Sequence, residues 1–156
     1  MKKFIYIILA YFLLPHLMKA QSLNNYQFEQ IDSLSLIEKR SVAVFIYTDW
    51  CRYCKNMEQK TFKNTEIVNK LNKKFYFVSL NAEEERAITF RGHRFQFKPN
   101  GKSTGIHALA EALGTVDNKI SYPTFCILNT DYEIIFQYDA YLNTKNMITI
   151  LDQLSN

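Results

Sequence analysis

Two short, continuous apolar runs stand out in the pattern of hydrophobic and polar positions. They cover Val42–Tyr47 and Phe75–Leu80 and are rich in β-branched and aromatic residues. Runs of this kind are typical of strands that are covered on both faces. Two further β-rich segments, Thr124–Leu128 and Glu133–Tyr138, are joined by the stretch Asn129–Tyr132 and predict a hairpin near the end of the chain.

Helical periodicity fills most of the sequence between these runs. Apolar residues recur at helical spacing in residues 24–39, in the stretch that follows residue 54, in Ile106–Leu113, and in a last segment that Asn143 or Thr144 caps. In the first segment these apolar residues are Tyr26, Phe28, Ile31, Leu34 and Ile37. The order of helices and strands predicts one α/β domain, with a mixed central sheet of about four to five strands flanked by helices.

The N-terminal 20 residues have the pattern of a signal peptide. Lys2 and Lys3 precede the apolar run Phe4–Leu14, and a small residue, Ala20, stands at the expected cleavage point. The apolar run is shorter than the ~20 residues that a membrane-spanning helix needs, so cleavage is favoured over an uncleaved N-terminal anchor. The sequence therefore predicts an exported protein, periplasmic or secreted, whose mature domain covers residues 21–156.

Cleavage also changes the charge of the chain. The full sequence has 19 basic and 15 acidic residues, a formal net charge of +4, but three of the basic residues lie before the cleavage point. The mature domain then carries a net charge of +1. A balance this close to zero gives no reason to expect a nucleic-acid partner. Export also places the cysteines where disulfides persist.

A segment of mixed character, at about residues 82–105, separates the second strand from the helix that follows it. It begins with three consecutive glutamates and then turns basic, and Phe95 and Phe97 alternate with polar residues. This pattern indicates a β-hairpin with a turn at Gly92-His93 and a solvated basic face, and in an exported protein it is favoured over nucleic-acid binding. The segment leaves the carboxyl end of a strand, where open α/β sheets bind ligands, so it is positioned to wall a groove there.

The candidate chemistry lies in Trp50-Cys51-Arg52-Tyr53-Cys54, directly after the first strand and at the start of a helix. Two cysteines at this spacing can hold, lose and regain a disulfide. The unpaired N–H groups and the dipole of the helix favour a thiolate on Cys51, and Arg52 adds a positive charge beside it. Cys54, one turn further on, is placed to attack a mixed disulfide. We therefore expect Cys51 to be the nucleophile and Cys54 the resolving cysteine.

Three other uses of the two cysteines fit the sequence less well. A zinc site needs about four ligands, and the addition of Cys126 without paired histidines leaves the set incomplete. A c-type haem site needs histidine after the second cysteine, where this chain has Lys55. A purely structural disulfide would close a loop too short to stabilise the fold much. We expect no metal and no cofactor, and we expect Cys126 to be a buried, unreactive thiol.

These features together resemble the thioredoxin superfamily. The resemblance covers nearly all of Val42–Leu154 and rests on the first strand, the Trp50–Cys54 site, the step Tyr122-Pro123-Thr124 and the final hairpin and helix. The stretch Cys54–Asn64 is similar to a subgroup that includes the exported C-terminal domain of the bacterial transmembrane thiol reductase. The resemblance implies a thioredoxin fold with a substrate groove beside the two cysteines.

The resemblance also assigns residues to this groove. It implies that Pro123 is cis and lies against the cysteines, that the backbone of Tyr122 pairs with a substrate strand, and that Trp50 flanks the groove. Two positions depart from the family pattern. Phe45 stands six residues before the first cysteine, where a buried carboxylate usually serves the resolving thiol, and Arg52-Tyr53 replaces the familiar Gly-Pro. The direction of electron flow is therefore not inherited.

The function expected from the sequence is thiol–disulfide exchange. The first choice is a soluble, monomeric reductase that receives electrons from a membrane thiol donor and reduces disulfides in exported proteins. The alternative enzyme is an oxidase or isomerase, because a stabilised thiolate makes a disulfide more oxidising. The alternative outside catalysis is a binding module in which the cysteine pair is vestigial and residues 82–105 form the interaction surface.

Overall fold

A computed structural model describes residues 21–102 and 104–154 of the chain, and the predicted signal peptide lies outside the described residues. In chain order the elements are α2 (Phe28–Ile37), β1 (Ser41–Tyr47), α3 (Arg52–Gln59), the 3-10 turn η1 (Thr61–Lys63), α4 (Thr65–Lys74), β2 (Phe75–Asn81), β3 (Ile88–Phe90), β4 (His93–Phe95), β5 (Phe97–Pro99), β6 (Gly105–His107), α5 (Ala108–Gly114), β7 (Thr115–Val116), β8 (Lys119–Ile120), β9 (Thr124–Leu128), β10 (Ile134–Tyr138) and α6 (Thr144–Leu154). In this part of the chain no helix combines the length and the apolar composition that crossing a bilayer requires.

The central sheet has four strands in the order β10-β9-β1-β2. β1 and β2 are parallel, as the helical crossover between them predicts. β9 is antiparallel to β1, and β10 is antiparallel to β9. The sheet is therefore mixed, and the α/β fold class predicted from the sequence is confirmed.

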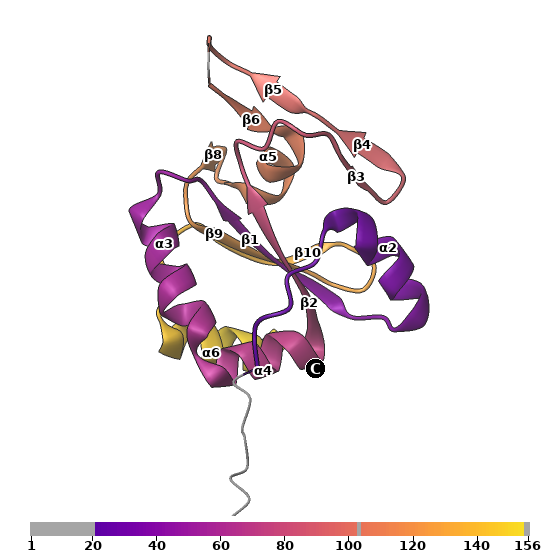
Figure 1. Ribbon diagram of the computed structural model, residues 1–156, viewed down its shortest axis with the longest axis vertical. Coiled ribbons are helices and arrows are strands. Elements are labelled where there is room, and N and C mark those ends of the chain that lie inside the picture. Colours follow the sequence, from indigo (N-terminus) through magenta and orange to yellow (C-terminus); the bar gives the residue numbers. More distant parts are fainter. Residues whose placement is uncertain (1–20, 103, 155–156) are drawn as a thin grey trace, which may run out of the picture.

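Helices cover both faces of the sheet, as Figure 1 shows. One face, here called the insert face, packs against α2, α5 and the segment between β2 and α5. The other, the site face, packs against α3, α4 and α6. The side chains of β1 alternate between the two cores: Val42, Val44 and Ile46 point into the first, and Ala43 and Phe45 into the second. Cover on both faces explains why the apolar run is continuous.

The helical stretch after the cysteines is divided into two helices and a short 3-10 turn. α3 ends at Gln59 and α4 begins at Thr65. Asn64 Oδ1 accepts hydrogen bonds from the backbone N–H groups of Glu66 and Ile67, the usual way in which asparagine caps the first turn of a helix. The turn between the helices places Phe62 in the core of the site face.

The first helix is shorter than the periodicity of residues 24–39 predicts. The residues before Phe28 run along β2, where the N–H of Tyr26 donates to the carbonyl of Phe77. Ile37 continues the helical spacing of the apolar residues in this segment, but its side chain is 86% exposed. The last turn of α2 therefore extends beyond the core that its earlier turns cover.

The segment at 82–105 contains two hairpins instead of the single one predicted. β3 pairs with β4 across the turn Arg91-Gly92, and β5 pairs with β6. Both turn residues have positive φ, 54° and 70°, as a type I′ turn requires, and glycine adopts such a φ without steric cost. β3 packs on α2, where the Phe90 and Phe28 rings meet edge-on at 4.9 Å. The first hairpin is therefore part of the core of the insert face.

Candidate active site

The register of the sheet brings two distant segments together. β1 ends at Tyr47, and the chain then turns directly into Cys51 and α3. Ile46 of β1 is paired with Thr124 of β9, so Pro123 lies beside the end of β1. The Tyr122–Pro123 peptide bond is cis. The cysteine segment and the proline segment thus meet at one end of the sheet, where Figure 1 shows the start of α3.

Cys51 and Cys54 form a disulfide at the start of α3. Cys51 is the N-cap residue of this helix, and its Sγ accepts a hydrogen bond of 3.1 Å from the backbone N–H of Cys54. The N–H of Cys51 donates in turn to the carbonyl of Thr48, which closes the turn between strand and helix. Once the disulfide is reduced, the N–H of Cys54 and the helix dipole stabilise negative charge on Cys51. Arg52 is exposed in the first turn beside it.

Aromatic rings border the disulfide. Trp50 and Tyr53 are 67% and 64% exposed. The Trp50 ring packs edge-on against Tyr122 with centroids 5.9 Å apart, and the Tyr53 ring packs against Tyr141 at 6.3 Å. Exposed rings that neighbours hold in place offer apolar area to a bound polypeptide at low entropic cost. Tyr141 was not predicted from the sequence, because its position beside Tyr53 depends on the fold.

Phe45 occupies the position where the resemblance would place a carboxylate. Its ring is buried, stacks on Tyr47 at 5.6 Å and meets Phe62 edge-on at 4.9 Å. The core beneath the disulfide is therefore aromatic and holds no acid at this position.

Glu58 is a carboxylate that sequence reasoning missed. It lies on α3 one turn after Cys54, and residues four apart on a helix are neighbours on its surface. Together with Phe45 it lines a pocket of about 180 Å³ on the site face. Partial burial raises the pKa of the Glu58 carboxyl, and the negative charge of Asp49 adds to the effect. Its spacing from the second cysteine is the signal that would have identified it.

The segment at 82–105 reaches the site through its first turn. Trp50 Nε1 donates a hydrogen bond of 3.0 Å to Glu83 Oε1. The hairpin β3–β4 packs instead on α2, where Arg86 pairs with Glu29 and the backbone N–H of Arg91 donates to Asp32. The expectation that this segment walls the groove therefore applies to Glu83 and is wrong for the first hairpin.

Cys126 lies within β9 on the insert face and is fully buried. Burial raises the pKa of its thiol to about 12. Such a thiol carries almost no thiolate near neutral pH, and the thiolate is the reactive form. The third cysteine of the chain is thus unreactive, as predicted, and the redox chemistry belongs to Cys51 and Cys54.

Solved structures with this fold include several proteins of thiol–disulfide chemistry. The chain is similar to a thioredoxin from Thermus thermophilus, with 18% identity, a TM-score of 0.60, and coverage of 86% of this chain and 88% of that one. It is similar to a disulphide isomerase from Xylella fastidiosa Temecula1, with 10% identity, a TM-score of 0.56, and coverage of 82% and 88%. It is also similar to the Neisseria meningitidis DsbD C-terminal domain in its reduced form, with 14% identity, a TM-score of 0.54, and coverage of 80% and 90%. At these identities the likeness establishes the fold.

The sequence itself also matches a known family. No curated protein sequence matches the chain. The family model of the thioredoxin-like domain, however, matches residues 28–155, which include the disulfide, the Tyr122–Pro123 step and all four strands of the central sheet. The chain therefore belongs to the thioredoxin-like family and carries the CxxC site of a thiol–disulfide oxidoreductase.

Proposed function

We propose that the protein is an exported, monomeric reductase that passes electrons from the Cys51–Cys54 dithiol to disulfides in other exported proteins. The observation that carries the proposal is the position of Cys51 as the cap of α3, where its sulfur accepts the N–H of Cys54. The helix start stabilises the thiolate of Cys51 in preference to that of Cys54. Cys51 is therefore the nucleophile.

The reaction proceeds in two exchanges. The Cys51 thiolate attacks one sulfur of the substrate disulfide, which forms a mixed disulfide and releases the other substrate sulfur as a thiolate. Cys54 then gives up its proton and attacks Cys51 Sγ, which releases the second substrate sulfur and forms the intramolecular disulfide present in the structure. The substrate disulfide is reduced and the dithiol is oxidised. A membrane thiol donor returns the electrons to the pair.

The residues around the disulfide hold the substrate. We assign Trp50, Tyr53 and Tyr122 to the walls of the groove, because two of these rings are exposed and the third packs against Trp50. The backbone of Tyr122, ahead of the buried Pro123, pairs with an extended substrate strand. Arg52 supplies positive charge beside the nucleophile.

Glu58 takes the proton of the resolving cysteine. The aromatic core around Phe45 offers no acceptor at the usual position. Glu58 lies one turn from Cys54, and its raised pKa brings the carboxyl closer to the range in which it exchanges protons near neutral pH. Because the side chain is partly exposed, the proton passes through water.

An oxidase or isomerase is the second candidate, and Arg52 is the residue that favours it. A positive charge beside Cys51 stabilises the thiolate of the reduced protein, which makes the disulfide more oxidising. The reduction potential separates the two candidates. A value near about −270 mV supports the reductase, and a value near about −120 mV supports the oxidase.

Insulin reduction by dithiothreitol tests the activity. The protein should accelerate it, Cys51→Ser should abolish the acceleration, and Cys126→Ser should retain it. The proposal fails if the protein adds nothing to dithiothreitol, or if Cys51→Ser matches the wild type.

Trapping of intermediates tests the order of the cysteines. Cys54→Ala should accumulate mixed disulfides with exported proteins, because the resolving step is removed while attack by Cys51 persists. Cys51→Ala should accumulate none. The opposite pattern would assign the attack to Cys54.

A further inference from the structure

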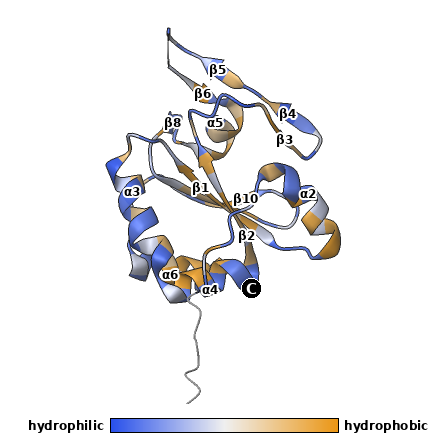
Figure 2. Ribbon diagram, in the orientation of Figure 1, coloured by the Kyte–Doolittle hydropathy of each residue, from blue (hydrophilic) through white to orange (hydrophobic). Residues whose placement is uncertain are grey.

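Two of the most exposed apolar side chains of the described chain stand next to each other at the end of α2. Leu36 and Ile37 are 89% and 86% exposed, more than Trp50 beside the disulfide at 67%. Figure 2 shows the last turn of α2 in the colour of hydrophobic residues, followed by a hydrophilic stretch before β1. An adjacent pair at this exposure lowers the free energy of the system when it enters an apolar environment.

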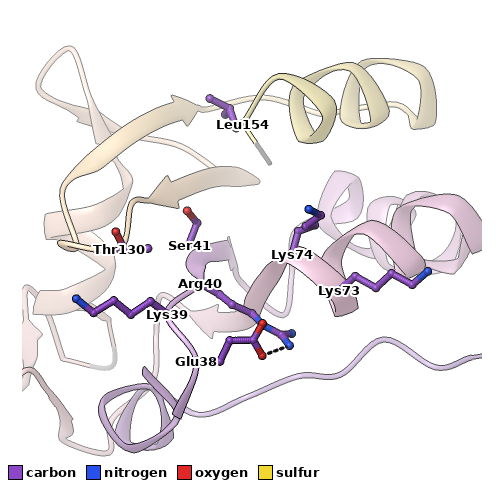
Figure 3. Close-up of a pocket in the computed structure, with 8 residues that line it drawn as sticks. All are labelled: Glu38, Lys39, Arg40, Ser41, Lys73, Lys74, Thr130 and Leu154. Carbon is purple, nitrogen blue, oxygen red and sulfur yellow. Dashed lines mark hydrogen bonds and ion pairs between the residues drawn. The ribbon is translucent and has the colours of Figure 1, made fainter. Parts of the chain in front are cut away.

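Basic residues lie next to this pair. Lys39 and Arg40 follow the pair in the chain, after Glu38. Lys73 and Lys74 end α4 on the other side of a pocket of about 270 Å³. Figure 3 shows the three lysine side chains fanning outward around Ser41 instead of converging in the pocket. This arrangement suits an extended negative surface better than a small enclosed anion.

The acids nearest to Lys73 and Lys74 are already paired, whereas Asp32 and Asp131 line a neighbouring pocket together with Leu36 and Lys39. Glu38, the acid among the residues that line the pocket at Ser41, pairs with Arg40. One turn earlier on α4, Lys70 pairs with Glu66 of the same helix and with Asp152 of α6. Among the described residues no ion pair involves Lys39, Lys73 or Lys74, and the excess positive charge of the region comes from these three lysines.

The chain enters the fold at the same place. The N–H of Asn24 donates to Asn72 Oδ1, and Asn72 Nδ2 donates to the carbonyl of Ser22. Arg40 donates to the carbonyl of Asn72 at 2.9 Å. Ser22 is therefore held beside the two lysines that end α4. The N-terminus that the predicted cleavage after Ala20 leaves, Gln21, therefore lies beside the same surface.

This surface, called here the basic pole, lies at the opposite end of the sheet from the disulfide. Its residues are Leu36, Ile37, Lys39, Arg40, Lys73 and Lys74. Its basic residues line the pocket at Ser41, the first residue of β1, whereas the cysteines follow Tyr47, the last. At about 3.3 Å per residue the strand separates the two ends by roughly 20 Å. Figure 1 shows α3 near one end of β1 and the last turn of α2 near the other.

We infer that the basic pole docks on a membrane surface that contains anionic phospholipids. Leu36 and Ile37 enter the boundary between headgroups and acyl chains, and the lysines lie at the level of the phosphates. The disulfide then faces away from the membrane and stays open to exported proteins. The inference does not depend on the direction of electron flow.

Sedimentation with vesicles tests the inference on the protein with the N-terminus that it carries after export. It should bind vesicles of phosphatidylglycerol and phosphatidylethanolamine, release them at about 0.5 M salt, and bind little to phosphatidylcholine alone. Each lysine near an anionic surface contributes about fivefold in affinity, so Lys73→Gln/Lys74→Gln should weaken binding about 25-fold. Leu36→Ser/Ile37→Ser should weaken it at least about tenfold.

A matched pair of lysines at the far end of the molecule supplies the control. Lys102→Gln/Lys119→Gln removes the same charge from two exposed positions and should bind as the wild type does. Circular dichroism and insulin reduction show that each variant is folded and active. Equal losses from the two lysine pairs, or equal binding to both kinds of vesicle, would overturn the inference.

Trp50 reports the orientation, because it is the only tryptophan of the chain. Brominated phospholipids quench a tryptophan that reaches the acyl chains. The bound protein should keep its fluorescence, since Trp50 lies at the other end of β1. Quenching on binding would mean that the aromatic surface around the disulfide meets the membrane, which contradicts docking through the basic pole.

Discussion

The two faces of the central sheet both bury cysteines, but the thiols differ in what they can do. The exposed fractions of Cys51, Cys54 and Cys126 are 4%, 1% and 0%, so access alone does not separate them. On the site face, a backbone N–H at the start of α3 reaches the sulfur of Cys51. On the insert face, Cys126 lies mid-strand, and burial raises its pKa to about 12. Reactivity here follows from the backbone position of the cysteine: a helix start supplies free N–H donors and a strand interior does not.

The same contrast applies to the titratable groups of the two faces. On the site face, Glu58 lines a pocket one turn from Cys54. On the insert face, His107 is fully buried, and its Nδ1 accepts the N–H of Leu109 at the start of α5. We therefore expect substitutions on the site face to change chemistry and substitutions on the insert face to change stability. Glu83, which belongs to the insert and contacts Trp50, connects the two.

Phe90→Ala should have the largest effect on stability without an effect on chemistry. The buried Phe90 ring meets Phe28 at 4.9 Å and Tyr132 at 5.3 Å, and its removal leaves a cavity in the core of the insert face. Substitutions of this kind cost about 3–5 kcal/mol of unfolding free energy. Denaturant unfolding measures the loss, and the rate of insulin reduction per folded molecule should be unchanged. A fall in that rate would show that the insert face supports the chemistry directly.

Glu58→Gln should slow the chemistry and leave the stability of the fold unchanged. The substitution keeps the size of the side chain and removes the proton acceptor, so release of the mixed disulfide should slow about tenfold. This factor is smaller than the 10²–10⁴ that a directly positioned base contributes, because water separates Glu58 from the thiol. Stopped-flow measurement of this step checks the prediction, with Glu66→Gln on α4 as the matched control. Equal rates for the wild type and Glu58→Gln would leave proton removal to solvent alone.

The order of the main elements and the reactive cysteines could be predicted because their signals are local. The run Val42–Tyr47 is continuous because both faces of β1 are covered, and burial on both faces requires apolar residues at consecutive positions. The cysteine pair and the proline before β9 could be recognised from the sequence alone, because residues of these types at these positions have few other roles. The apolar, β-rich runs therefore located β1 and β9, whose register brings the two segments together.

The features that could not be predicted depend on what the chain meets in space. Ile37 continues the apolar stripe of its helix, yet it lies beyond the core, and periodicity does not show where a core ends. Glu58 is one of several polar residues on α3, and only the pocket that it lines together with Phe45 distinguishes it from the others. Which of the short strands β3 to β6 pair with one another could not be predicted, because strands of three residues specify their register only weakly.

His107 should make the insert face sensitive to acid. Burial lowers the pKa of its imidazole below the ordinary value, with Glu84 and Arg86 the charged groups nearby. Since the unfolded chain binds the proton more readily, the stabilising contribution is present above the unfolded pKa of about 6.5 and is lost as the pH falls below it. His107→Asn keeps an acceptor for the N–H of Leu109 but does not titrate. Between about pH 7.5 and 5.5 the wild type should lose about 2–4 °C more in Tm than this variant. Identical pH dependence would exclude His107 as the group.

Glu83→Ala should have the smallest effect, and it tests whether the two faces are coupled. The substitution removes the acceptor of the Trp50 indole N–H, so the ring loses one of the contacts that hold it beside the disulfide. An exposed hydrogen bond of this kind contributes about 0.5–1 kcal/mol, which predicts a rise of about 2- to 5-fold in KM for a protein disulfide. A small aromatic disulfide that needs no groove should be reduced at the wild-type rate. Glu85→Ala, two residues further on and equally acidic, is the matched control. An equal effect of both variants would indicate a general loss of negative charge, and no effect of Glu83→Ala would mean that the insert face acts on stability alone.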